Sequence, residues 1–328
     1  LRKVYPFLDE SYAEWIGHPL AEVPAPEGDG SYADYFLAPF FEALRAVGVA
    51  PRVVDNHAAY REGRFTDCTR AVVENVEQAR EILERVSGRQ LPRDWFPWTC
   101  RDSDGRLVEG RVTKCEWPIL EFENEAGETV RNNLAKGEGK LPWRLDWPAK
   151  WSWLGVTFEA FGKDHATRGG SFDTGREIID TIYGGSVPDH LVYEWIHLKG
   201  SGAMHSSTGV AVSAAEMLRI APPEALRWLV LKPQPQRHID FDPGLGVLNL
   251  VDDYDRAGQA RLAGESGDDS RAWELSQVAD IPEALPAVPY RHLMTLAQSR
   301  PGLDGVVETL QRTGVLGDVS DDDRDWLE

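Results

Sequence analysis

The sequence predicts an α/β fold of the doubly wound kind, followed by an α-helical region. Three observations carry this prediction. Helix-like and strand-like apolar patterns alternate over residues 1–90, strand–loop–helix patterns with glycine-rich loops recur over residues 151–209, and helical patterns dominate after residue 210. Because parallel strands joined by helices bring their carboxyl ends to one edge of a sheet, a ligand site is expected at that edge.

Length and composition limit the class of protein. A chain of 328 residues suits two or three domains and needs no disulfide or metal to form a core. Three cysteines argue against a secreted disulfide scaffold and for a reducing compartment. No apolar run approaches the ~18 residues of a membrane span, and no signal peptide is visible, so we expect a cytoplasmic protein without a membrane partner. The net charge of −19 disfavours a nonspecific nucleic-acid binder but leaves room for a local basic groove.

Both ends of the sequence have the character of segment interiors. Residue 1 is Leu rather than Met, and residues 320–328 begin a helix that stops after less than two turns. The expectation is a fragment of a longer protein, with a frayed tail as the alternative.

The first predicted elements are a helix, a strand and a second helix. Residues 33–47 gather apolar side chains on one helical face, and residues 66–87 repeat them at spacings of three and four, ending at Gly88. Between them, residues 52–54 form a short apolar run that predicts a strand.

The next segment changes in character. Residues 92–140 contain short alternating runs separated by turn sequences at 103–105 and 125–127, which predict a small antiparallel insertion. Residues 151–162 then predict a buried strand, and a glycine-rich turn leads into a helix at about residues 174–183.

A further apolar stretch at residues 191–198 precedes another glycine-bearing loop. Beyond it, a capping box at 213–216 and a proline-led start at 222–224 predict two helices, and helical patterns with polar joints continue over residues 244–328.

The first candidate site is the loop of residues 162–175, which holds four glycines in fourteen positions. Glycines let a backbone approach a ligand closely, and the following helix offers free N–H groups to an anion. Asp173 suits a ribose hydroxyl or a helix cap, and His165 suits a polar substrate. The loop is neither a P-loop nor GxGxxG, so a structural turn with a capping aspartate remains the alternative.

Three other candidates give weaker signals. The loop of residues 198–209 suits either a cover for a triphosphate or a flexible linker. Cys100 and Cys115 lack close partners and predict two small apolar residues rather than a zinc site. Residues 237–243 combine Arg, His and two Asp, which predicts a polar network at a domain junction, with a catalytic set as the alternative.

Taken together, these residues resemble the class I type of lysyl-tRNA synthetase, a family found mostly in archaea and some bacteria. The resemblance rests on residues 141–151 (LPWRLDWPAKW), 155–178 (GVTFEAFGKDHATRGGSFDTGREI), 192–200 (VYEWIHLKG) and 220–256 (IAPPEALRWLVLKPQPQRHIDFDPGLGVLNLVDDYDR). It covers nearly the whole chain to about residue 260 and is thinner beyond it.

The resemblance implies a class I synthetase Rossmann-type catalytic domain with a small β insertion, followed by an α-helical domain. Residues 1–91 and 141–200 would form the catalytic domain, and residues 92–140 the insertion. Residues 201–255 would carry the signature loop and a connecting helical region, and residues 256–328 the start of a helical anticodon-binding domain.

The resemblance also implies an activity, lysine–tRNA ligation, in which ATP with Mg²⁺ activates L-lysine for transfer to tRNA(Lys). The implied enzyme is a monomer without zinc. The implied lysine-binding residues are Trp143, His165 and Tyr193, because aromatic rings and a neutral polar partner suit an ammonium group. The implied ATP-binding residues are Gly162, Asp164, Gly169, Gly170, Asp173 and Met204.

Two departures from the family pattern bear on catalysis. The HIGH-type motif that holds the ATP phosphates is absent, and its usual place would precede residue 1, so the chain alone is predicted to be inactive. The KMSSSKG loop appears at residues 203–209 without its lysines, which leaves Ser206, Ser207 and Lys199 as the implied catalytic groups. The alternative is a synthetase-like paralogue that binds nucleotide or tRNA without aminoacylation.

Overall fold

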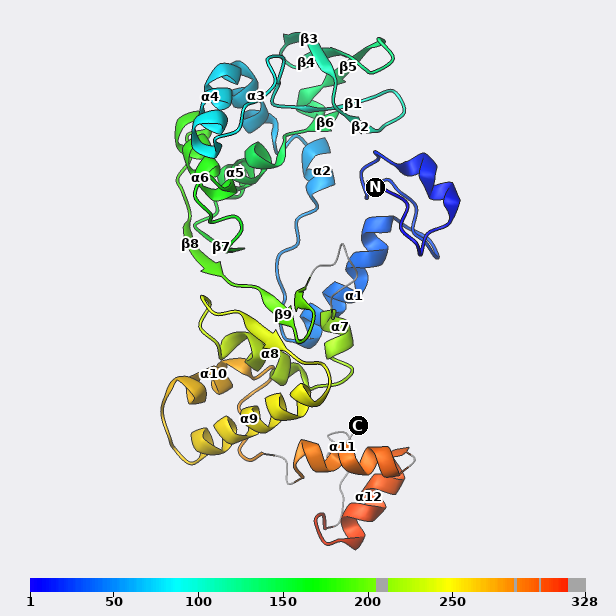
Figure 1. Cartoon of the computed structure of the whole chain (residues 1–328), viewed down its shortest axis with the longest axis vertical. Helices are drawn as coiled ribbons and strands as arrows, with labels where there is room; N and C mark the ends of the chain where they lie inside the picture. Colours follow the sequence, from blue (N-terminus) through cyan, green and yellow to red (C-terminus); the bar gives the residue numbers. More distant parts are fainter. Residues whose placement is uncertain (205–211, 286–287, 301, 318–328) are drawn as a thin grey trace. The chain divides into compact units, whose positions relative to one another are not determined.

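The computed structural model describes residues 1–204, 212–285, 288–300 and 302–317 (Figure 1). It contains two units. The first consists of residues 1–39 and 51–194, and the second consists of residues 40–50 and the chain from residue 195 onward. Both units contain helices and strands, so the predicted α/β class is confirmed.

The helices of the amino-terminal part are η1 (Glu10–Trp15), α1 (Tyr32–Ala46), α2 (Asn56–Arg61), α3 (Thr66–Glu74) and α4 (Val76–Ser87). The predicted helices are therefore present, but the second is interrupted at Asn75. The backbone of Asn75 leaves the helical region at φ −128° and ψ 41°, and its Nδ2 donates to the carbonyl of Ala71 at 2.8 Å. Gly88 ends α4 in the left-handed conformation, as predicted.

The strand predicted at residues 52–54 is wrong. These residues form no strand, and Val53 is 58% exposed. Valine favours strands because it packs well on a half-buried pleated surface, and this segment has neither a pairing strand nor burial in the described chain.

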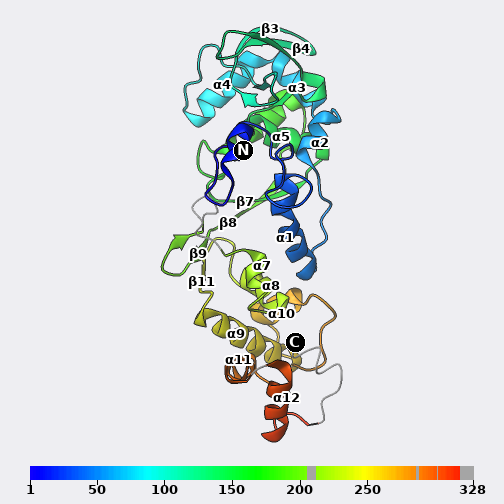
Figure 2. The same cartoon turned by 90° about the vertical axis from the view of Figure 1, so that its right-hand side faces the viewer.

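The predicted antiparallel insertion is confirmed as two small sheets. One has the order β2 (Leu107–Val108), β1 (Thr99–Arg101), β6 (Gly139–Lys140), and the other is a meander of β3 (Arg111–Glu116), β4 (Ile119–Glu123) and β5 (Thr129–Asn133). Gly105 and Gly127 supply positive φ angles in the turns after β1 and β4. Figure 2 shows α3, α4 and α5 next to these strands.

The insertion shares its core with the helices. Phe65 and Val72 from α3 and its start, Ile82 from α4, and Leu120 and Phe122 from β4 belong to one buried cluster. Cys100 is buried in the same cluster and Cys115 packs at its edge, so both thiols serve as small apolar groups there. Burial raises the pKa of the Cys100 thiol to about 12.

A β-α-β unit completes the first unit. It consists of α5 (Trp143–Leu154), β7 (Phe158–Gly162), α6 (Ser171–Ile178), the π-helical turn η3 (Ile179–Tyr183) and β8 (Asp189–Tyr193). Strands β7 and β8 are parallel, with Phe158 opposite Asp189 and Gly162 opposite Tyr193. This is the predicted strand–loop–helix–strand pattern, although α6 begins three residues before the predicted helix.

The buried strand predicted at residues 151–162 is wrong in its first half. Trp151 lies in α5, which ends at Gly155 with φ +64°, and only the last five residues form a strand. Trp147 and Trp151 are one helical turn apart and pack in one buried cluster with Phe161. The spacing of four residues between the tryptophans therefore indicated a helix here, although the apolar run favoured a strand.

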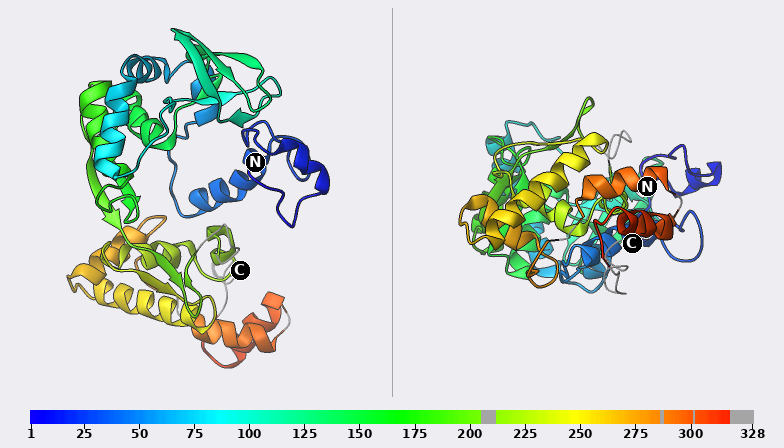
Figure 3. Two further views of the ribbon diagram at one scale, coloured as in Figure 1. Left: turned by 45° about the horizontal axis from the view of Figure 1, so that its top comes forward. Right: turned by 90° about the horizontal axis from the view of Figure 1, so that it is seen from below.

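The second unit has its own small sheet and the predicted helices. Strand β9 (Ile196–Leu198) pairs with β10 (Gly202–Ala203) and, in parallel, with β11 (Ile239–Phe241). The helices are α7 (Ala214–Met217), α8 (Pro223–Leu231), α9 (Leu245–Leu262), α10 (Asp268–Ser276), α11 (Tyr290–Ser299) and α12 (Gly302–Arg312), coloured yellow-green to red in Figure 3. The capping box at the start of α7 and the proline at the start of α8 are confirmed.

None of the helices in the described ranges is long and apolar enough to cross a bilayer.

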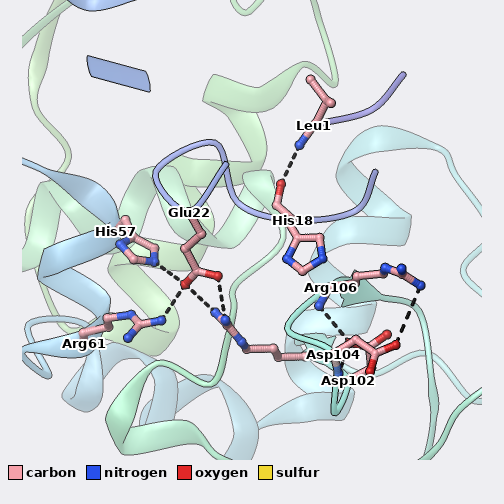
Figure 4. A network of polar contacts seen from close by, with 9 residues as sticks. Leu1, His18, Glu22, His57, Arg61, Asp102, Asp104 and Arg106 are labelled. Carbon is pink, nitrogen blue, oxygen red and sulfur yellow. Dashed lines mark hydrogen bonds and ion pairs between the residues drawn. The ribbon is translucent and has the colours of Figure 1, made fainter. Parts of the chain in front are cut away.

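One carboxylate joins three separate parts of the first unit (Figure 4). Glu22 accepts hydrogen bonds from Nε2 of His57 at 2.8 Å, from Arg61 at 2.5 Å, and from both Nη atoms of Arg101 at 2.8 and 2.6 Å. Burial opposes ionisation of Glu22, but the hydrogen bonds from Arg101, His57 and Arg61 outweigh it and lower the pKa to about 2. This carboxylate therefore fixes the segment before α1 to α2 and to β1.

Candidate functional site

The candidate site lies where β7 and β8 end. Gly162 and Tyr193 are the last residues of the two strands and lie opposite each other, and the N–H of Lys163 donates to the carbonyl of Tyr193 at 3.0 Å. Because the strands are parallel, the loop of residues 162–170 and the residues after β8 leave the sheet at the same edge. The sequence predicted its ligand site at this edge.

Close contacts surround the glycines of this loop. A Cβ on Gly162 would lie 2.9 Å from Oδ1 of Asp164, and a Cβ on Gly170 would lie 2.6 Å from the carbonyl oxygens of His165 and Thr167. Gly169 has φ +74°, and a Cβ there would lie 2.7 Å from the carbonyl oxygen of Val86. Backbone packing thus explains Gly169 and Gly170 whether or not a nucleotide approaches them, whereas Gly162 has only a carboxylate oxygen close by.

Hydrogen bonds fix the path of the loop. The N–H of His165 donates to the carbonyl of Gly162 at 3.0 Å, and the N–H of Phe172 donates to the carbonyl of His165 at 3.1 Å. Oδ2 of Asp173 accepts the N–H of Gly169 at 2.9 Å. Asp173 therefore holds the loop from within, which is the structural role that the sequence left open.

Helix α5 brings an aromatic surface to this loop. The ring of His165 lies 5.8 Å from that of Trp143 and 5.5 Å from that of Trp147, and the two indoles stack with centroids 5.4 Å apart. Trp143 is 48% exposed, whereas Trp147 is buried. The structure thus brings Trp143 and His165 together, as predicted. Trp147 was not predicted, although its spacing of four residues from Trp143 was the available signal.

Tyr193 lies on the other face of the strand pair. It is opposite Gly162 in the register, whereas Phe161, which packs against Trp147, points to the opposite side. Cε2 of Tyr193 would lie 3.8 Å from a Cβ on Gly162, next to Asp164. The three predicted lysine-binding residues are therefore divided: Trp143 and His165 pack together beside Trp147, whereas Tyr193 points to the other face of the strand pair.

The charges at this edge are mostly paired. Lys163 and Glu194 form an ion pair at 2.7 Å, and Oδ2 of Asp164 lies 3.8 Å from Nε2 of His165. Nζ of Lys150 lies 2.6 Å from Asp146 and 5.8 Å from the centroid of the Trp143 ring. The half-exposed ring of Trp143 therefore offers an apolar face to an aliphatic chain and already has one ammonium group, that of Lys150, near it.

Hydrogen bonds from Trp143, a predicted site residue, and from Arg144, which was not predicted, connect α5 to the loop. Nε1 of Trp143 donates to Oγ of Ser171 at 3.3 Å. Nη1 of Arg144 donates to the carbonyl of Gly170 at 2.9 Å and to Oγ1 of Thr174 at 3.0 Å. No pattern in the sequence indicated this contact of Arg144, because adjacent residues of a helix do not share a face.

The remaining predicted residues belong to the second unit or lie outside the described residues. Nζ of Lys199 lies 3.0 Å from Oδ2 of Asp242. Met204 packs against the cluster that contains Phe241. Ser206 and Ser207 lie outside the described residues.

Residues of the segment 237–243 form polar contacts, but these contacts lie within the second unit and not at the predicted domain junction. The imidazoles of His197 and His238 stack with centroids 4.6 Å apart, and Nδ1 of His197 lies 3.6 Å from Asp240. These contacts and the Lys199–Asp242 pair join β9 to β11, as a network that pins neighbouring strands would do. Among the described residues, no group of three or more His, Cys, Asp or Glu side chains is arranged to hold a metal ion.

Comparisons with known proteins address the family. The family model described as "tRNA synthetases class I (K)" matches residues 1–279. The lysine–tRNA ligase of Picrophilus torridus is 40% identical over 327 residues, which cover 98% of this chain and 64% of that protein. Lysine–tRNA ligase 1 of Methanosarcina acetivorans is 42% identical over 343 residues, which cover 100% of this chain and 64% of that protein.

The lysine–tRNA ligase of Thermoplasma volcanium is 43% identical over 300 residues, which cover 91% of this chain and 59% of that protein. The chain thus spans less than two thirds of the length of these three relatives. The family match extends over both units and includes the candidate site at the ends of β7 and β8. The chain therefore belongs to the class I (K) family of tRNA synthetases.

Proposed function

We propose that this chain carries the amino-acid and nucleotide sites of a lysine–tRNA ligase. Its family, and relatives of that name at about 40% identity, support this function. The structural observation that carries the proposal is the half-exposed surface of Trp143 and His165 at the carboxyl edge of β7 and β8. Aromatic faces attract an ammonium group and also cover the methylene chain of lysine.

The proposed reaction has two steps. The carboxylate of L-lysine attacks the α-phosphate of Mg²⁺-bound ATP, and pyrophosphate leaves. A ribose hydroxyl at the 3′ end of tRNA(Lys) then attacks the lysyl carbonyl, and AMP leaves. We assign the lysine site to Trp143 and His165, which pack together, and to Tyr193 at the end of β8.

The proposed ATP site uses the loop after β7. The backbone of Gly162, Gly169 and Gly170 and the carboxylates of Asp164 and Asp173 lie at the edge where ligands of doubly wound sheets bind. Since Oδ2 of Asp173 already accepts a backbone N–H, a ribose contact would use Oδ1.

The second unit would supply the signature loop. We assign catalytic roles to Lys199, Ser206 and Ser207, and a nucleotide contact to Met204. Hydroxyl and amide groups hold phosphate by hydrogen bonds and lack a full positive charge, so Lys199 is the cation that remains in this segment.

A second candidate function is a synthetase-like paralogue that binds its ligands without aminoacylation. The observation that favours it is the ion pair of Lys199 with Asp242, which offsets the charge of that cation. Pyrophosphate exchange by Lys199→Ala and Ser206→Lys variants of the protein encoded by the complete open reading frame separates the two functions. A ligase that depends on this loop should lose exchange in the first variant or gain it in the second, whereas a paralogue should show no exchange in either.

The main test uses the complete open reading frame that encodes this chain. Lysine-dependent ATP–pyrophosphate exchange, with arginine and ornithine as competing amino acids, should show selectivity for lysine. Calorimetry with L-lysine then tests the amino-acid site in the 328-residue chain itself. Exchange that arginine supports as well as lysine would overturn the proposed substrate. The proposal also includes a cytoplasmic location and a monomeric state. Light scattering of the eluted protein tests the monomeric state.

A further inference from the structure

Arg144 is the second residue of α5 and reaches the point where the glycine-rich loop enters α6. Its Nη1 lies 2.9 Å from the carbonyl oxygen of Gly170, 3.0 Å from Oγ1 of Thr174 and 3.4 Å from the carbonyl oxygen of Gly169. Thr174 is fully buried, so the guanidinium reaches a protected part of the junction.

The charge of Arg144 has no acidic partner among the ion pairs of the described chain. Burial, and then repulsion from Arg89, lower its pKa. A half-buried cation held by neutral acceptors and close to a second arginine is costly to keep. Its Nη1 is shared among two carbonyl oxygens and one hydroxyl oxygen, and the rigid guanidinium plane fixes the direction of these N–H groups, which the freely rotating ammonium of a lysine does not do.

The contacts of Arg144 complete the hold on the loop. Asp173 accepts the N–H of Gly169, whereas Arg144 donates to the carbonyl groups of Gly169 and Gly170. Glycines have no side chains of their own to restrict these peptide groups. The carbonyl of His165 is bound to the N–H of Phe172, two residues beyond Gly170, so the placement of His165 depends on this junction.

We infer that Arg144 is a positioning residue for the lysine site, acting through the Gly169–Gly170 carbonyls on the loop that carries His165. The inference rests on the proposed function for the identity of the ligand. The first turn of α5 then has two roles: Trp143 lines the proposed site, and Arg144 holds the loop that carries His165.

The test compares Arg144→Gln, Arg144→Lys and Arg89→Gln with the parent chain. Arg89→Gln is the matched control, because it removes a nearby positive charge without removing a hydrogen bond to the loop. Calorimetry with L-lysine, well below the unfolding temperature, gives the dissociation constant of each folded variant. The ring resonances of His165 in the ligand-free chain give a second readout that does not depend on lysine.

We expect Arg144→Gln to weaken lysine binding by about tenfold and to shift the His165 resonances, and Arg144→Lys to restore part of both. Arg89→Gln should bind lysine as the parent does. Parent-like lysine affinity and unchanged His165 resonances in Arg144→Gln would overturn the positioning role and leave the proposed function intact. A parent chain that binds no lysine would instead count against the proposed lysine site, and unshifted His165 resonances in Arg144→Gln would then overturn the positioning role as well.

Discussion

Lys199 and Asp242 form an ion pair, with Nζ of the lysine 3.0 Å from Oδ2 of the aspartate. Oδ1 of the same aspartate accepts the N–H of Gly244 at 2.9 Å, directly before α9. The hydrogen bond from Lys199, followed by the one from Gly244, lowers the pKa of Asp242. The residue after β9 is therefore tied to the start of the longest helix of the second unit.

This pair should make the stability of the second unit depend on acid pH. Because the pKa of Asp242 is lower in the folded state, its contribution is fully present above the unfolded value of about 3.9 and is lost as the pH falls through the folded value. Asp242→Asn should lower the unfolding temperature at pH 7, and its difference from the parent should narrow below about pH 4. Asp280→Asn, at an exposed loop position, is the control. A constant difference across this range would contradict the assignment.

Substitution of Glu22 should lower the free energy of unfolding more than substitution of any other carboxylate in the first unit. Glu22→Gln leaves two arginines and a histidine without their shared anion, and we expect a loss of about 2 kcal/mol in the free energy of unfolding. Since the folded pKa is about 2, the parent should lose this contribution as the pH falls from about 4.5 towards 2. Denaturant titrations at several pH values measure it, with Glu125→Gln in an exposed turn as the control. Equal stability of Glu22→Gln and the control at pH 7 would exclude the role.

His165→Ala should affect binding more than folding. The His165 side chain packs beside Trp143 and Trp147 but is about a third exposed, and the hydrogen bonds of its loop come from the backbone. We expect the lysine affinity to fall by about 1–3 kcal/mol with little change in unfolding temperature. Calorimetry and thermal unfolding of the same samples separate the two effects. A large loss of stability with unchanged affinity would move His165 to the core.

Two glycines allow the cost of a clash to be separated from the cost of backbone strain. Gly169 and Gly184 both have positive φ angles, +74° and +68°, but only at Gly169 would a Cβ meet a neighbour, the Val86 carbonyl oxygen. Gly184→Ala should cost about 1–2 kcal/mol from strain alone. Gly169→Ala should cost at least about 1 kcal/mol more because the backbone of α4 must move. Equal losses in chemical denaturation would show that the loop relaxes freely.

The sequence predicted the parts of the fold that depend on local pattern. Gly88 ends its helix, the turns of the insertion contain Gly105 and Gly127, and the capping box stands at the start of α7, because each of these rests on short-range chemistry. The strand at residues 52–54 and the extended start of residues 151–162 were wrong, since apolar runs do not reveal whether a pairing partner exists.

The site was predictable in its side-chain types and less so in its connections. His165 and Trp143 meet as expected, and the bond from the N–H of Gly169 to Asp173 fits the structural alternative for that residue, but nothing in the sequence indicated that Arg144 holds Gly170. Such contacts depend on how α5 packs beside α6, and residues 144 and 170 are 26 positions apart. The roles of Gly162, Asp164, Tyr193, Met204, Lys199, Ser206 and Ser207 towards ligands remain predictions.

The carboxylate of Glu22 also has an evolutionary consequence. His57, Arg61 and Arg101 all share this one acceptor, so the effects of substituting them should not add. When one of these residues is substituted, two remain to donate to the Glu22 carboxylate. When a second is substituted, only one remains, and the burial of the carboxylate is no longer offset. The order in which a lineage accumulates such changes therefore decides which of them are tolerated, and double-mutant cycles between α2 and β1 should reveal this epistasis.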